Sequence, residues 1–422
     1  MLKQYLYICT CVSVLLASAA AKAETPGHAS DNSQSDKHMP HAADETPRHE
    51  DGIQAGGFIL RPGASFSLGF DSLGAKDDVN SKGDGFVDIG IHLKTKLRDE
   101  DTHSWNNKLS IHWEQFFGLD NEPPSGEPTV VLTSEADLFK ESFLRISPKL
   151  SYSYLPGPAL DEFQMFHDNH DMRLGSAFIL QPDQGASVSQ RLGYFFHGKI
   201  YQGLMGLTFF DHRFDAATRW TFFPELSMAL NLDFRVIHYL KAERPASNDS
   251  ISTQQANHTA LPFRVKYSLG GTALEHFNYE LGAGYSYAYY GKEAKSHLFI
   301  MHAKFECAFT EDTKIFVEYR KDHNNALYGD FYRFHRGTFG FDALWFERLH
   351  TTASFGVGYF TFQASHTAIR KDLLLYAQAS IDYSFMPNMH LGVDYTAHHN
   401  TSDMAIAEYT KHVVTLHFGY EY

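Results

Sequence analysis

The carboxyl-terminal stretch reads Tyr409-Thr410-Lys411-His412-Val413-Val414-Thr415-Leu416-His417-Phe418-Gly419-Tyr420-Glu421-Tyr422. From Val414 onward, apolar and aromatic side chains alternate with polar ones, which places one kind on each face of a β-strand. The stretch is also long enough to cross the hydrocarbon core of a bilayer, which needs ~9–11 tilted residues. Alone, the pattern predicts either a membrane-spanning strand or an edge strand of a soluble sandwich, and the other segments must decide between them.

The same alternation recurs along most of the chain. Segments with one apolar and one polar face cover residues 64–70, 87–93, 109–113, 226–234, 261–269, 277–289, 299–309, 315–319, 339–345, 353–359, 373–385 and 391–397. No stretch shows a competing helical period of 3.6 residues. The sequence therefore predicts an all-β fold.

The polar faces of these segments are dense with charge, whereas the opposite faces carry Phe, Leu, Val and Tyr. The segments are longer than the ~5–6 residues typical of globular strands. Aromatic residues such as Trp105, Trp345 and Tyr383 crowd their ends, where the girdles of a membrane barrel lie. We therefore predict a transmembrane antiparallel β-barrel over residues 57–422, with the charged faces lining its lumen. The candidate lumen-lining residues are Asp88, His92, Lys94, His112, Glu114, Asp233, Arg235, Arg264, Lys266, Lys304, Glu306, Glu318, Arg320, Asp342, Asp382 and Asp394.

The amino terminus has the organisation of a secretory signal peptide over residues 1–23. A short basic start precedes an apolar core, and Ala-Lys-Ala at 21–23 forms a small-x-small cleavage site. The mature chain is therefore expected to be exported and to begin at Glu24. Both earlier cysteines leave with the signal peptide, so the mature chain keeps Cys307 alone and forms no internal disulfide.

Residues 24–56 differ in composition from the rest of the chain. They contain several prolines and acids and almost no large apolar residue, so they cannot bury enough surface to offset chain entropy. We predict a disordered, His-rich periplasmic tail. Its four histidines are weak candidates for binding a transition metal, because their spacing matches no defined ligand set: His28, His38, His41 and His49.

The lengths of the links predict an orientation and a strand number. Tight links at 223–225, 310–312, 347–350 and 386–388 suit short periplasmic turns, whereas longer polar links at 72–84, 119–134, 241–258, 321–330 and 400–407 suit the outer side. Both chain ends then lie on the periplasmic side, so the strand number is even. We predict about 18 strands, with 16 and 20 left open because residues 148–198 contain several turn signals.

Two parts of the chain resemble known outer-membrane proteins. The final strand, with Phe418, Tyr420 and Tyr422, resembles the terminal strand of Gram-negative outer-membrane β-barrels, which implies recognition by the barrel-assembly machinery. The first hairpin, with Ser65-Phe66-Ser67-Leu68-Gly69-Phe70-Asp71 and Phe86-Val87-Asp88-Ile89, resembles the opening of β-barrel porins associated with exopolysaccharide systems. Glu318-Tyr319-Arg320, followed by Asn324-Asn325-Ala326 and Asp330-Phe331-Tyr332-Arg333, resembles the same porins. The resemblance implies passage of material through the outer membrane and brings no catalytic residues.

Composition and motifs narrow the function further. The chain holds 25 histidines but no Gly-x-Ser-x-Gly elbow, His-Glu-x-x-His motif or phosphate loop, so we expect no enzyme and no cofactor. A formal net charge of −14 disfavours nucleic-acid partners. We expect a porin-like channel or export pore for small solutes or polysaccharide, in contact with outer-membrane lipid and lipopolysaccharide. The alternatives are a structural or adhesive barrel with exposed loops and a metal-handling outer-membrane protein, and the oligomeric state stays open.

Overall fold

The computed structural model describes residues 52–72, 83–97, 102–117, 128–155, 169–181, 187–201, 208–223, 225–240, 259–273, 276–290, 295–325, 331–364 and 367–422. The expected signal peptide, its cleavage site and the four tail histidines lie outside these residues. The described residues form β1 (Ile53–Ala55), β2 (Phe58–Asp71), β3 (Asp84–Leu97), β4 (Ser104–Phe116), β5 (Thr129–Asp137), β6 (Leu144–Leu155), β7 (Asn169–Leu180), β8 (Val188–Tyr201), β9 (Phe209–Phe223), β10 (Leu226–Tyr239), β11 (Thr259–Ala273), β12 (Phe277–Tyr290), β13 (Lys295–Thr310), β14 (Thr313–Asn325), β15 (Phe331–Trp345), β16 (Leu349–Ala364), β17 (Thr367–Met386), β18 (Met389–Ser402), the 3-10 turn η2 (Ala405–Ala407) and β19 (Tyr409–Glu421).

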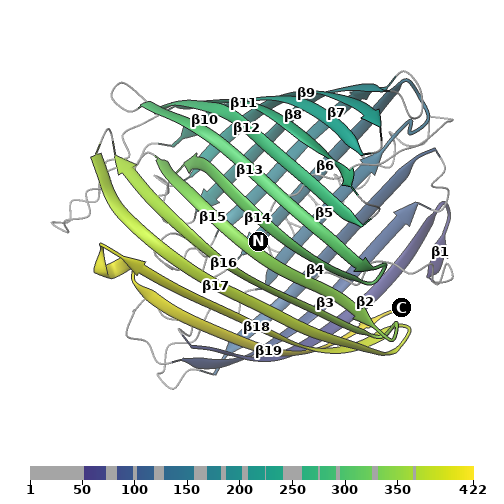
Figure 1. Cartoon of the computed structure of the whole chain (residues 1–422). Coiled ribbons are helices and arrows are strands. Elements are labelled where there is room, and N and C mark those ends of the chain that lie inside the picture. The colour runs from purple at the N-terminus through teal and green to yellow at the C-terminus, as the bar shows by residue number, and fades with distance from the viewer. Residues whose placement is uncertain are drawn as a thin grey trace.

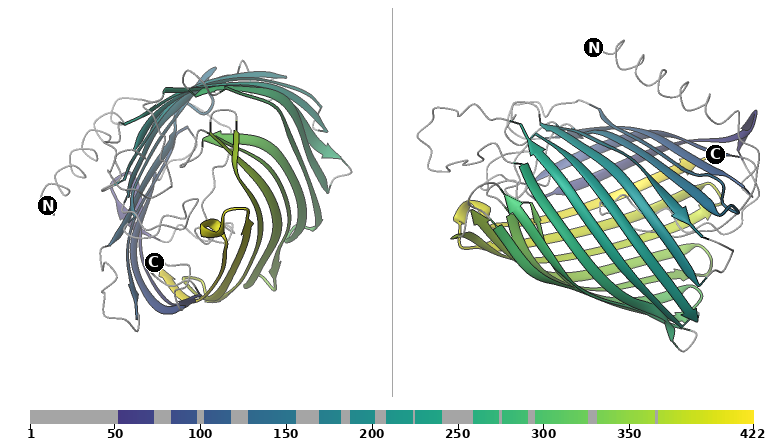
Figure 2. Two further views of the ribbon diagram at one scale, coloured as in Figure 1. Left: turned by 90° about the vertical axis from the view of Figure 1, so that its left-hand side faces the viewer. Right: turned by 90° about the horizontal axis from the view of Figure 1, so that it is seen from above.

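Strands β2 to β19 close into a single antiparallel barrel of eighteen strands (Figures 1 and 2). Each strand pairs with the next in sequence, and β19 pairs with β2. At this closure Leu416 stands opposite Leu68 and Phe418 opposite Phe66, so the apolar faces of the first and last strands coincide. The predicted barrel and its strand number are confirmed.

The short strand β1 lies outside the closed ring. It pairs with the beginning of β2, where Ala55 stands opposite Phe58 and Ile53 opposite Leu60. The chain end meets β2 just beyond this point, because Tyr422 N–H donates to Pro62 C=O at 2.9 Å. Residues 53–55 are therefore ordered as a strand, and the expectation of a disordered tail reaching residue 56 is wrong for them.

The links divide between the two ends of the barrel much as the sequence indicates. The four predicted short links join β9 to β10, β13 to β14, β15 to β16 and β17 to β18, all at one end, where the chain terminus also lies (Figure 1). Several predicted long links are shorter than expected, because strand pairing continues into them. β5 already begins at Thr129, β14 reaches Asn325, and β18 reaches Ser402 before η2. Residues 148–198, for which the sequence left the strand number open, contribute the end of β6, all of β7 and most of β8.

The outer surface of the barrel is an apolar band. Large apolar side chains are exposed at every second position, as at Leu391 and Val393 in β18 or Ile89 and Ile91 in β3. A continuous exposed apolar surface of this kind is stable against lipid hydrocarbon and not against water. In the described residues, no helix is long and apolar enough to cross a membrane.

Candidate functional site

The candidate site is the inner wall of the barrel. In β3, Asp88, His92 and Lys94 alternate with the exposed Ile89 and Ile91, so they occupy the opposite, inward face. The same alternation places the other sequence-derived candidates on the inward face of their strands. These are His112 and Glu114 in β4, Asp233 and Arg235 in β10, Arg264 and Lys266 in β11, Lys304 and Glu306 in β13, Glu318 and Arg320 in β14, Asp342 in β15, Asp382 in β17 and Asp394 in β18.

Most of these charges form ion pairs along or between strands. Measured distances are 3.2 Å for Asp88–His112, 3.2 Å for Glu280–Lys266, 3.2 Å for Glu306–Lys304, 3.2 Å for Asp322–Arg320, 3.4 Å for Asp322–Arg264 and 3.3 Å for Asp342–His350. Asp233 pairs with Arg213, and Arg235 with Asp211. Because these cations lie beside carboxylates, much of the wall presents both signs in near balance.

Two inward histidines are held between carboxylates, and a third lies beside one. His302 lies 3.3 Å from Glu280 through Nδ1 and 3.3 Å from Glu318 through Nε2. His417 lies 2.7 Å from Asp382 and 2.9 Å from Asp394, and His92 lies 3.7 Å from Glu421. Across the residues that the structure describes, no group of three or more His, Cys, Asp or Glu side chains is arranged to hold a metal ion. The contacts of His302 join neighbouring strands, whereas those of His417 with Asp382 and of His92 with Glu421 reach across one intervening strand.

One part of the wall departs from this balance. Arg61, Lys94 and Lys108 stand at directly opposed positions on β2, β3 and β4, and Lys96 lies two residues beyond Lys94. Like charges in opposed positions destabilise a sheet unless something compensates. Together with Glu135 and neighbouring polar residues they line a cavity of about 300 Å³.

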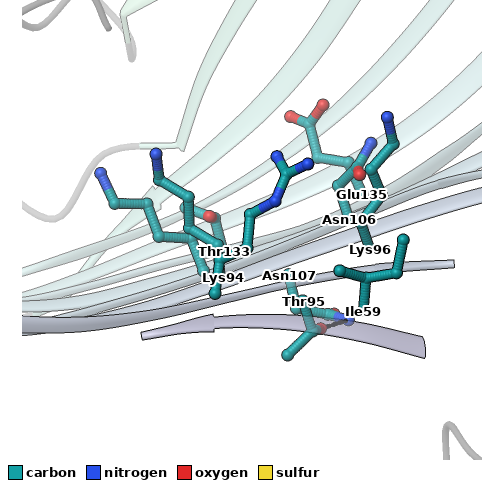
Figure 3. Close-up of a pocket in the computed structure, with 10 residues that line it drawn as sticks. Ile59, Lys94, Thr95, Lys96, Asn106, Asn107, Thr133 and Glu135 are labelled. Atoms are coloured by element: carbon teal, nitrogen blue, oxygen red, sulfur yellow. Dashed lines mark hydrogen bonds between the residues drawn. The ribbon is translucent and has the colours of Figure 1, made fainter. Parts of the chain in front are cut away.

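The close-up of this cavity shows how the strands divide their side chains. Lys94, Lys96 and Glu135 extend to one side of the strands, whereas Thr95 lies on the other side (Figure 3). One carboxylate neutralises part of the charge, since Glu421 accepts a hydrogen bond from Lys94 at 2.5 Å, whereas Glu135 pairs with Lys149 at 3.3 Å. The lining of the cavity therefore carries a surplus of cationic side chains.

A buried polar network holds the last long link against the wall. Arg370 donates to Asp372 at 3.0 Å, and its guanidinium lies 3.9 Å from the centroid of the Phe362 ring. Asn400 donates to Asp372 at 3.3 Å and to the Ala407 carbonyl at 2.6 Å. These contacts fix η2 at the rim of the barrel next to β17 and β18.

Sequence reasoning missed the wall residues of the β5–β9 region. Arg145 pairs with Asp137, Asp171 contacts both Arg173 and His197, and Arg191 lies 3.7 Å from Asp215. The alternation was hard to recognise there, because most of β5 lies in the predicted link 119–134 and turn signals interrupt the pattern near β6 to β8. The strict alternation of charge in Asp211, Arg213 and Asp215 is the signal that could have found this part of the wall.

The predicted assembly signal lies at the closing edge of the barrel. Phe418 points outward and stacks on Phe385, with ring centroids 6.2 Å apart, and Tyr422 is exposed at the chain end. Tyr420 stands opposite both Met389 and Ala64 at the seam. Recognition of these residues by an assembly machinery stays a prediction.

No protein-family model matches the chain, and no curated protein matches it. Similar solved structures are Pseudomonas aeruginosa OpdL (8% identity, TM-score 0.45), Acinetobacter baumannii OccAB2 (11%, 0.48) and a BenF-like porin from Pseudomonas fluorescens Pf-5 (8%, 0.47). Each similarity covers 86% of this chain, and 98%, 97% and 99% of those chains respectively. At these identities and TM-scores, neither function nor substrate transfers from those proteins to this one.

Proposed function

We propose that the chain is an outer-membrane, porin-like channel for small hydrophilic solutes. The observation that carries the proposal is the pairing of an apolar outer band with a charged inner wall on one closed eighteen-stranded barrel. A closed barrel leaves no unpaired edge in lipid, and charged side chains on its inner face hold water. Both features are needed for a transmembrane aqueous path, and neither is needed for a soluble β-protein.

The orientation follows from the same layout. The amino-terminal strand β1 and the chain terminus lie at the end that carries the short turns. Short turns face the periplasm in bacterial outer-membrane barrels. We therefore place the residues before β1 in the periplasm and the long links outside the cell, and we assign no reaction to the chain.

The test compares two neighbouring positions on β5, Thr133 on the inner wall beside the basic cavity and Leu132 on the outer face. Each is changed to cysteine in a Cys307→Ser background, since Cys307 is a free thiol. The purified barrels are inserted into planar bilayers, and conductance is recorded before and after adding a charged, membrane-impermeant thiol reagent. The reagent is expected to reduce the conductance of Thr133→Cys and to leave that of Leu132→Cys unchanged.

Two other outcomes would contradict the channel. If folded protein shows no conductance at any voltage, a plugged structural or adhesive barrel becomes the better account. If the reagent affects both cysteine variants equally, the inner wall is not the conducting path. A channel through the barrel axis predicts only the asymmetric result.

A further inference from the structure

A repeated pair of side chains marks the outer surface near the long-link end of the barrel. In five hairpins a tyrosine hydroxyl lies within hydrogen-bonding distance of a histidine Nδ1 on the next strand. The pairs are Tyr152–His170 (3.0 Å), Tyr194–His212 (2.9 Å), Tyr285–His297 (2.5 Å), Tyr319–His335 (2.9 Å) and Tyr395–His412 (2.9 Å). The ring centroids are 6.1–6.3 Å apart in all five pairs.

The pairs share one register as well as one contact. Each histidine faces, across the ladder, the residue two positions after its tyrosine, as His412 faces Ala397 and His297 faces Tyr287. Each histidine also lies within the first five residues of its strand, directly after a link at the long-link end. The tyrosine is therefore about 7 Å deeper toward the middle of the apolar band than its histidine.

Two further outward histidines lie at the same end. His238 Nδ1 lies 3.0 Å from Thr259 Oγ1 across β10 and β11, and His399 Nδ1 lies 2.7 Å from Thr410 Oγ1 across β18 and β19. We call the seven side chains the histidine belt: His170, His212, His238, His297, His335, His399 and His412. The belt places hydrogen-bonding nitrogens at the border of the apolar surface, and each Nδ1 already has a hydroxyl partner.

The opposite end of the outer surface has a different chemistry. There the large exposed side chains at the border are phenylalanine, tryptophan, methionine and tyrosine: Phe222, Phe223, Phe309, Trp345, Phe346, Met386, Tyr383 and Tyr422. Aromatic residues at both interfaces are usual in membrane barrels. Among the described residues, the histidines held by hydroxyl groups gather at the long-link interface, where they suit lipid headgroups that offer hydrogen-bond acceptors.

We propose that the histidine belt binds the phosphate-bearing headgroups of a glycolipid in the outer leaflet. When a hydroxyl donates to Nδ1, the proton of the neutral imidazole resides on Nε2 and can be donated to a phosphate oxygen, except at His399, whose Nε2 lies 3.3 Å from Thr401 Oγ1. Hydrogen bonds to a charged acceptor are stronger than those between neutral groups. A cation strengthens the same site at one point, because Lys321 stands directly opposite His335. This inference rests on the proposed membrane placement, and it adds a lipid-binding surface to the channel.

The repeated geometry also explains why the tyrosines are needed. An exposed histidine on a strand can rotate between rotamers, and a hydrogen bond from a neighbouring tyrosine restricts it to one orientation. Five such pairs distributed over β6 to β19 fix donors around much of the circumference. A single headgroup needs only a few of them, so the belt suits a ring of lipids.

The test uses three of the best-defined pairs and a bis-phosphorylated lipid A as the probe. The variant His297→Phe/His335→Phe/His412→Phe removes the donors and keeps aromatic surface. Loss of three hydrogen bonds is expected to weaken retention of the probe by about tenfold, measured by native mass spectrometry of the detergent-purified barrel. The variant Tyr285→Phe/Tyr319→Phe/Tyr395→Phe keeps the histidines and is expected to lose about two- to threefold, because their orientation alone is relaxed.

The matched control is Tyr267→Phe. Tyr267 is an exposed tyrosine on β11 that stands opposite Leu230 and Ala283 and faces no histidine, so its change should leave retention equal to wild type. Equal retention by the triple-histidine variant and the control would overturn the proposal. So would equal binding of lipid A and its dephosphorylated form, or of dioleoylphosphatidylcholine, because the belt would then not distinguish the phosphorylated glycolipid.

Conductance separates this proposal from the channel itself. All substituted side chains lie on the outer face, so every variant should show wild-type conductance in planar bilayers. Lost lipid retention with unchanged conductance supports the belt and leaves the channel intact. Wild-type barrels that retain lipid A but never conduct would overturn the channel and leave the belt standing.

Discussion

Lys94 on β3 donates a hydrogen bond of 2.5 Å to Glu421 on β19, although 327 positions separate the two residues in the chain. The bond passes over β2, which lies between them in the closed barrel. It can form only after the first and last strands have met, so it reports closure of the ring. The side chains are 30% and 31% exposed, which makes the pair less screened than one in open water.

A double-mutant cycle on Lys94→Met and Glu421→Gln should give a coupling free energy of about 0.5–1 kcal/mol. The measurement is urea unfolding from liposomes. Lys149–Glu135 is the matched control, because its side chains are 49% and 59% exposed at a distance of 3.3 Å, and its coupling should be smaller. A larger coupling in the control pair would contradict closure across the seam.

Substituting an outward residue by arginine should be much more damaging than the same change on the inner wall. Val393 points outward and is 43% exposed, so Val393→Arg should lower the free energy of unfolding by ~2–4 kcal/mol if the residue lies near the bilayer midplane. Thr415→Arg is the control, since Thr415 faces inward on the neighbouring strand, opposite Asp394. Equal folding yields in liposomes would contradict the register.

Gly392 is adjacent to Val393 but is not a suitable control position. A Cβ atom there would lie 2.3 Å from Asp382 Oδ1 and 2.5 Å from His417 Cε1. Any larger residue would therefore disturb the His417 contacts. A folding defect in Gly392→Arg would report this clash and not the polarity of the face.

Ion selectivity should follow the sign of the charge removed from the inner wall. The combined change Lys94→Gln, Lys266→Gln and Arg320→Gln removes the cation from three ion pairs of the wall. The reversal potential in a salt gradient should shift toward cation preference, because the altered wall carries an excess of carboxylates. Strong selectivity would need a ring of charges of one sign, and the mixed wall does not supply one that would oppose this shift. The reciprocal change, Glu421→Gln with Glu280→Gln, should shift it toward anions. Shifts of the same sign in both variants would contradict conduction along this wall.

The processed amino terminus is a prediction from the sequence alone. If residues 1–23 are a signal peptide, amino-terminal sequencing of protein from the outer membrane should begin at Glu24. A retained Met1 in that material would contradict the expected export route. The control is the same protein made without the apolar segment, which should not reach the membrane fraction.

The sequence by itself determined the all-β class, the barrel and the face on which each candidate charge lies, and it predicted about 18 strands with 16 and 20 left open. The reason is physical, since a strand between lipid and water must alternate at every residue, and that period is visible in segments such as 391–397. The prediction from the sequence failed where the alternation of apolar and polar residues was weak. The predicted link 119–134 covers the first six residues of β5 (Thr129–Asp137), and the predicted tail includes Ile53–Ala55, because a three-residue strand carries no period.

Only the tertiary structure decided which charges meet. Arg61, Lys94 and Lys108 form one basic row because the registers of three strands place them side by side, and no local pattern encodes a register between strands. The tyrosine–histidine pairs are hidden for the same reason, because the partners of a pair such as Tyr395 and His412 are separated by a link and meet diagonally across the ladder. Alternation fixes the face of a residue, whereas strand pairing, set by links and closure, fixes its neighbours.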